Sequence, residues 1–221
     1  MSTQEEQNIR AIVSNGRLEL LIIYHETGGN LYGYLCDIAA ENGHIDCLKY
    51  LHENGCPWST ETCNKAAKNG HIDCLKYLHE NGCPWSTETC TKAATNGHID
   101  CLKYLHQNDC PWSTETCTKA AKNGHLNCLK YLHENGCPWS TETCTKAATN
   151  RHLDCLEYAH KNGCPWNIVK EILIPKWRAA VKIRPYLLHW IEDTSKTLYA
   201  ETGKGRKCDY DTFVEDFNDF L

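Results

Sequence analysis

The chain has 221 residues, of which 41% are apolar, and its formal net charge is −5. This length and composition allow a sizeable buried core. No part of the chain is basic enough to suggest electrostatic capture of nucleic acid. The longest uncharged apolar run, LLIIY at residues 20–24, is too short to cross a bilayer.

The first residues, MSTQEEQNIR, are polar and acidic and do not have the pattern of a secretory signal. We therefore expect a cytoplasmic protein without a membrane segment. The chain contains 16 cysteines, and in the cytoplasm their thiols are expected to stay reduced.

The same residues recur at a fixed spacing of 27 along most of the chain. Such a period predicts stacked supersecondary units with atypical units at the ends. Residues 1–28 read as an N-terminal capping repeat. The five repeats that follow are 29–55, 56–82, 83–109, 110–136 and 137–163.

Each unit predicts two short helices. In the unit 56–82, Ser59 is placed to cap the first helix, and Cys63, Ala66 and Ala67 form a narrow stripe of small residues on it. Asn-Gly at 69–70 ends this helix. The second helix begins near His71, and the Cys-Pro-Trp that opens the next unit is extended. The fold class is therefore all-α.

The repeated cysteines and histidines could carry chemistry. Catalysis needs one preorganised constellation, whereas a Cys/His pattern present in every copy is typical of packing. Equivalent cysteines in layers about 8–10 Å apart are out of disulfide reach. Non-equivalent pairs such as Cys63 and Cys74 remain possible. We expect no catalytic residue and no cofactor.

Zinc is the alternative hypothesis, because one unit and its neighbour supply enough ligands for a tetrahedral site. These ligands are Cys56, Cys63, His71, Cys74, His79 and Cys83. No Cys-x2-Cys pair is present, and Cys63 and Cys74 lie on apolar stripes, where a neutral thiol behaves as a small hydrophobic group. Buried free thiols are favoured over a metal site.

The stretch AAKNGHIDCLKYLHENG, residues 66–82, resembles the second half of an ankyrin repeat. The resemblance covers residues 29–163 well and 2–28 weakly. An ankyrin repeat has about 33 residues, and the stretch that would form its projecting β-hairpin is missing here. The short Cys-Pro-Trp form is similar to ankyrin-like proteins of large DNA viruses of protists, which implies the host cell cytoplasm as a location.

The resemblance implies a helix-turn-helix solenoid of about six units, without hairpins, that binds other proteins. It also implies that the histidine after each Asn-Gly turn makes hydrogen bonds between helices. Tryptophans are expected to seal neighbouring linkers, because an indole buries a large apolar area. We expect structural roles for Trp58, Trp85, Trp112, Trp139, Trp166, Cys63, Cys90, Cys117, Cys144, His71, His98 and His125.

The predicted outer side of the first helices is the candidate protein-binding surface. Glu61 and Lys65 are spaced for an ion pair within the helix, and the pair recurs in the next three units. The residues that differ among the copies are expected to be exposed and to set specificity. With the lysine series, the candidate binding residues are Asn64, Lys65, Lys68, Thr91, Lys92, Thr95, Thr118, Lys119, Lys122, Thr145, Lys146 and Thr149. A solvated face without a partner is the alternative.

The repeat pattern ends after Trp166. Residues 164–203 predict a helical C-terminal cap, with a peripheral membrane or partner-binding segment as the alternative. Residues 204–221 predict a basic linker followed by an acidic and aromatic tail, which either packs on the array or docks on a partner. Cys208 and His189 are weak candidates for a lone active site. Taken together, the sequence predicts a monomeric, non-enzymatic scaffold that binds proteins rather than nucleic acid or membranes, with a metal-binding, thiol-rich protein as the alternative function.

Overall fold

A computed structural model describes residues 3–165, in which the chain forms twelve α-helices and no strand. The predicted all-α fold is therefore confirmed for these residues. Trp166, almost all of the predicted C-terminal cap, and the predicted linker and tail lie outside the described residues, as do Cys208 and His189.

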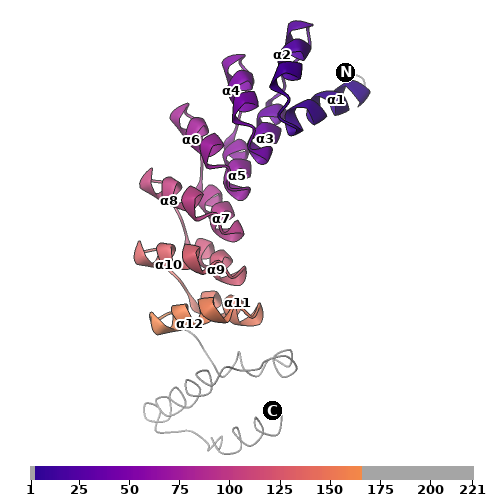
Figure 1. Ribbon diagram of the computed structural model, residues 1–221. Helices are drawn as coiled ribbons and strands as arrows, with labels where there is room; N and C mark the ends of the chain where they lie inside the picture. The colour runs from indigo at the N-terminus through magenta and orange to yellow at the C-terminus, as the bar shows by residue number, and fades with distance from the viewer. Residues whose placement is uncertain (1–2, 166–221) are drawn as a thin grey trace, which may run out of the picture. The chain divides into compact units, whose positions relative to one another are not determined.

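Two helices occur in every 27-residue unit (Figure 1). The odd-numbered helices, here called the first helices, are α1 (Thr3–Ser14), α3 (Gly33–Asn42), α5 (Thr60–Lys68), α7 (Thr87–Asn96), α9 (Thr114–Lys122) and α11 (Thr141–Thr149). The even-numbered helices, here called the second helices, are α2 (Leu18–Glu26), α4 (Ile45–Glu53), α6 (Ile72–Glu80), α8 (Ile99–Gln107), α10 (Leu126–Glu134) and α12 (Leu153–Lys161). In Figure 1 the first helices form one row and the second helices another.

A serine starts each of the four first helices from α5 to α11. Ser59 is extended, with φ −145°, and its side chain accepts a hydrogen bond from the backbone N–H of Glu61. Thr62 returns the contact, because its hydroxyl accepts a hydrogen bond from the N–H of Ser59 at 3.2 Å. This reciprocal arrangement is a capping box, which satisfies backbone donors that a helix start leaves unpaired.

The core lies between the two rows of helices. From α3 onward it consists of a cysteine and the Ala-Ala pair on each first helix and of cysteine and leucine on each second helix, such as Cys74, Leu75 and Leu78 of α6. Small side chains on the first helices allow close approach, and neighbouring first helices contact one another more extensively than neighbouring second helices do. The units therefore stack mainly through their first helices.

None of the helices in residues 3–165 is long and apolar enough to cross a membrane.

Candidate protein-binding face

The first-helix cysteines are completely buried. Cys63, Cys90, Cys117 and Cys144 are each 0% exposed. A hydrogen bond with the cysteine of the next linker, together with burial, raises the pKa of these thiols, so they stay protonated. Their position is that of packing residues. They contact neither solvent nor the outer surface of the first helices.

The histidine after each first turn lies against the unit before it. His71 Nε2 donates a hydrogen bond to the backbone oxygen of Glu41 at 3.0 Å, and His125 Nε2 does the same to Thr95. His98 occupies the equivalent place against Gly70, where an added Cβ would lie 2.4 Å from its Nδ1. These rings therefore join consecutive units rather than face a ligand.

The tryptophans are half-buried, not fully buried as a sealing role would suggest. Trp58, Trp85, Trp112 and Trp139 have one face covered, because each indole stacks on a histidine of the preceding second helix. For Trp112 the partner is His106, with ring centroids 4.0 Å apart, and Tyr131 meets the indole edge at 6.3 Å. His106 Nδ1 also hydrogen-bonds the Tyr131 hydroxyl at 2.9 Å.

In each of these aromatic clusters a tryptophan contacts a histidine and a tyrosine, and the roles of the histidine and the tyrosine were not predicted from the sequence. The sequence suggested His79 only as a zinc ligand, yet it stacks on Trp85 and hydrogen-bonds Tyr104. The signal was available, since this histidine and the tyrosine also recur every 27 residues. In residues 3–165 no group of three or more His, Cys, Asp or Glu side chains is placed to hold a metal, and the arrangement does not favour the zinc alternative.

Two members of one predicted binding series lie inside the stack. Asn64 and Thr118 are only 4% and 7% exposed, so the expectation that these two residues are exposed was wrong. The Asn64 side-chain oxygen accepts a hydrogen bond at 2.7 Å from Thr89 of the next unit, and Thr118 lies 3.2 Å from Thr143 in the same way. Thr91 is half-buried and hydrogen-bonds Thr116. The physical reason is that the capping threonine of each following unit needs a partner for its hydroxyl.

The predicted ion-pair ladder is only partly formed. Glu88 pairs with Lys92 at 3.2 Å, and Glu115 with Lys119 at 3.6 Å, as does Glu142 with Lys146. Lys65 is the exception, because it pairs at 2.9 Å with Glu41 of the preceding unit and not with Glu61. The Glu61 carboxylate instead accepts a hydrogen bond from the Asn64 amide, which separates it from Lys65.

The remaining candidates lie on the outer side of the first helices, here called the first-helix face. Lys68, Lys122 and Thr149 are exposed, and Thr95 is half-buried. Thr145 and the paired lysines Lys92, Lys119 and Lys146 are also half-buried. Lys92, Lys119 and Lys146 therefore share one strip with the glutamates that pair with them.

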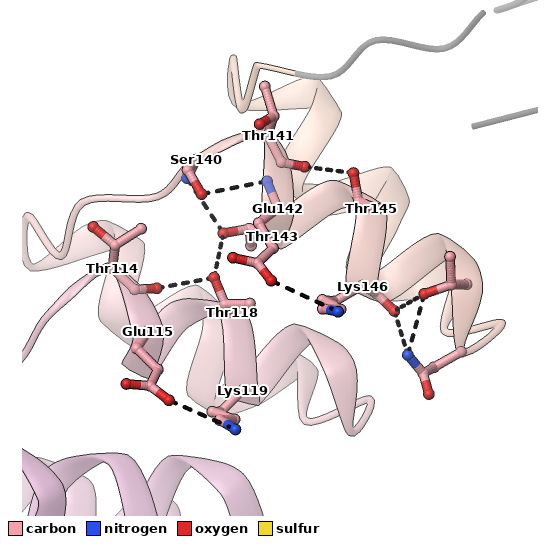
Figure 2. A network of polar contacts seen from close by, with 12 residues as sticks. Thr114, Glu115, Thr118, Lys119, Ser140, Thr141, Glu142, Thr143, Thr145 and Lys146 are labelled. Carbon is pink, nitrogen blue, oxygen red and sulfur yellow. Dashed lines mark hydrogen bonds and ion pairs between the residues drawn. The ribbon is translucent and has the colours of Figure 1, made fainter. Parts of the chain in front are cut away.

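A shallow pocket of about 400 Å³ lies on this face between α9 and α11. Figure 2 shows the polar network of this pocket. The Glu115–Lys119 pair lies on α9 and the Glu142–Lys146 pair on α11, and a hydrogen bond between Thr118 and Thr143 joins the two helices. The lining residues are Thr114, Glu115, Thr118, Lys119, Lys122, Glu142 and Lys146. Lys122 has no ion-pair partner among the described residues.

Comparisons with known proteins agree with this architecture. A solved structure of the human ASB11 ankyrin repeat domain superposes with a TM-score of 0.63 at 21% identity, covering 71% of this chain and 84% of that one. No curated protein sequence matches the chain. The family model for ankyrin repeats (three copies) matches residues 36–114 and 91–173, more than half of the chain. The chain therefore belongs to the ankyrin repeat family.

Proposed function

We propose that this protein is a non-enzymatic scaffold that binds another protein on its first-helix face. The observation that carries the proposal is the open polar pocket between α9 and α11, which combines three lysines with two carboxylates. The repeated cysteines, histidines and tryptophans are occupied by contacts between units. The outer side of the first helices is free of these contacts, and we assign the partner to it.

The charges of this face favour a partner with carboxylates. Lys119 and Lys146 pair with exposed glutamates. Such exposed ion pairs contribute little to stability, so a carboxylate of the partner can take the place of each glutamate. Lys68 and Lys122 are exposed and have no ion-pair partner among residues 3–165. They occupy the same position two units apart, with Thr95 and Thr149 at the alternate positions.

The alternation of lysine and threonine at this position sets the distance between Lys68 and Lys122. Layers of packed helices are separated by about 8–10 Å, so Lys68 and Lys122 lie on the order of 20 Å apart along the stack. An extended peptide covers that length in about six residues at about 3.3 Å each. We propose that a partner segment with two acidic positions at this separation binds along the first-helix face.

The ankyrin resemblance and the composition support the rest of the proposal. The protein acts without a cofactor, as a monomer, and binds neither nucleic acid nor membranes. The short Cys-Pro-Trp unit supports a location in the cytoplasm, which would be that of a host cell if the protein is viral.

The test is a quantitative affinity purification with two matched double variants. Lys68→Glu with Lys122→Glu reverses the unpaired charges of the first-helix face. Lys49→Glu with Lys103→Glu makes the same charge change at exposed positions of the second helices. We expect the first variant to lose partners that the wild type and the control retain, with far-UV circular dichroism unchanged in all three. Partners lost from the control and kept by the first variant would contradict the assignment of the face.

A further inference from the structure

Each first-helix cysteine lies next to the cysteine that opens the following linker. Cys90 Sγ is 3.7 Å from the backbone oxygen of Cys110, while Cys110 Sγ reaches back to the backbone oxygen of Ser86 at 3.4 Å. The two thiols therefore share one layer between the start of α7 and the next linker. The equivalent pairs are Cys36/Cys56, Cys63/Cys83, Cys90/Cys110, Cys117/Cys137 and Cys144/Cys164.

The two members of a pair differ in their access to solvent. The first-helix cysteine is 0% exposed in every pair, whereas Cys110 and Cys137 retain 3% exposure and Cys56 and Cys164 retain 5%. The proline that follows each linker cysteine is exposed, so this sulfur lies at the edge of the core. A small reagent would meet the linker cysteine first.

In the Cys90/Cys110 pair the pKa values of the two thiols are shifted in opposite directions. Hydrogen bonding with the Cys90 side chain lowers the pKa of Cys110 and outweighs the opposing effect of burial. The same contact, together with burial, raises the pKa of Cys90. The Cys110 sulfur is the one of the pair nearer to solvent, and the thiolate is the form of cysteine that reacts.

The second-helix cysteines provide a contrast within each unit. Cys101 is 1% exposed, and burial raises its pKa to about 12. No other thiol is among the causes of that shift. Cys101 is therefore expected to be inert under conditions in which Cys110 reacts.

We propose that the five cysteine pairs are reversible dithiol sites that hydrogen peroxide oxidises to disulfides in the folded protein. The linker thiolate attacks the peroxide O–O bond, which breaks and gives a sulfenic acid and, after protonation, one water. The first-helix sulfur then attacks the sulfenic sulfur. The S–S bond forms, the S–O bond breaks, and the thiol proton leaves with hydroxide as the second water.

The balance is two thiols and one peroxide giving one disulfide and two waters. Two electrons pass from the sulfurs to the peroxide oxygens. A thiol reductant reverses the change by exchange through a mixed disulfide. Each disulfide would tie a first helix to the linker that leads into the next unit, and would thereby fix the stacking of the two units.

The experiment treats the folded, full-length protein with hydrogen peroxide, blocks the remaining thiols with an alkylating reagent, and maps peptides without reduction. We expect peptides joined through Cys90–Cys110 and Cys117–Cys137, each lighter by two hydrogen atoms and separable by a reductant. Cys110→Ser should lower the yield of peptides joined to Cys90 by any disulfide at least tenfold. Cys101→Ser, the matched control in the same unit, should leave it unchanged.

A second variant identifies the order of events. Cys90→Ser removes the resolving thiol, so the sulfenic acid at Cys110 should accumulate and be trapped by dimedone. Cys137→Ser repeats the test one unit later and serves if Cys110→Ser does not fold. Links to the second-helix cysteines at comparable yield, irreversible oxidation of Cys110 without a link, or no reaction in the folded protein would each overturn the proposal.

Discussion

The buried threonine near the start of each first helix from α5 to α11 makes one hydrogen bond within its own unit and one to the unit before. The Thr89 hydroxyl accepts a hydrogen bond from the N–H of Ser86 at 3.2 Å and donates one to the side-chain oxygen of Asn64 at 2.7 Å. Thr89 is 0% exposed and Asn64 is 4% exposed, so loss of the hydroxyl would leave the buried Asn64 oxygen without this partner. The cost of an unsatisfied buried group therefore applies at this residue.

Thr89→Val should lower the free energy of unfolding by about 1–3 kcal/mol, because it leaves a buried donor and acceptor unpaired. Thr87→Val, a change of the same shape two residues earlier, should cost less than about 0.5 kcal/mol because Thr87 is only half-buried. Urea titrations followed by circular dichroism measure both. Equal losses in the two variants would show that the hydrogen bonds between units contribute nothing.

This contact also explains why part of the candidate site could not be predicted from the sequence. The sequence places Asn64 and Thr118 on the first helices, but their burial depends on the rotation of one unit relative to the next. A period of 27 predicts that neighbouring units are equivalent without predicting which side of a helix meets the capping threonine. The Lys65–Glu41 pair was missed for the same reason, since it also joins two units.

The glycines of the two turns in each unit have different neighbours. Gly97 has φ 80°, and a Cβ there would lie 2.5 Å from Nδ1 of His125. Gly136, at the end of a second helix, has φ 79° but nothing within 4 Å of such a Cβ. Asp109 occupies this second position in one unit, with φ 61°, which agrees with the open space.

Gly97→Ala should therefore destabilise the protein more than Gly136→Ala. Both variants have the backbone cost of about 1–2 kcal/mol for a left-handed residue with a side chain. Only Gly97→Ala also displaces the His125 ring, and we expect that to add about 1 kcal/mol or more. Thermal unfolding of the two purified variants side by side gives the comparison. A larger loss for Gly136→Ala would contradict the packing assigned to His125.

At the scale of helices and linkers, the Cys-Pro-Trp segment replaces the hairpin that ankyrin repeats of about 33 residues contain. Its indole stacks on the second helix of the preceding unit and meets the tyrosine of its own second helix, as Trp85 does with His79 and Tyr104. This contact joins the second helices, which otherwise touch one another less than the first helices do. Half-burial of the indole means that it stabilises the stack less than a core residue would.

Trp112→Ala, in the middle of the array, should lower the free energy of unfolding by about 2 kcal/mol, below the range for a fully buried aromatic residue. Lys119→Ala removes only an exposed ion pair and should cost less than about 0.5 kcal/mol. Differential scanning calorimetry should show a clearly lower melting temperature for Trp112→Ala. Equal melting temperatures would refute the role of the tryptophan.

At the scale of the whole molecule, the array is a series of layers, each of which contacts its neighbours along the chain. The fold could be predicted because the four units from α5 to α12 repeat the same cap, turn and core residues, so the local signals of each unit agree with those of the next. The binding partner could not be predicted, because the exposed positions differ little among the units. The central claim is that the periodic residues are packing residues, and that they make the same contacts between any two neighbouring units.

The most direct test of that claim is deletion of residues 83–109, one whole unit. The deletion brings Trp112 next to His79 and Thr116 next to Asn64. In the intact chain Trp85 and Thr89 occupy these places, so the deletion replaces each contact by one between the same residue types. We predict one cooperative unfolding transition at a lower midpoint, with helical ellipticity per residue of the repeat region unchanged. Loss of cooperative unfolding or of helical content would show that the units are not interchangeable layers.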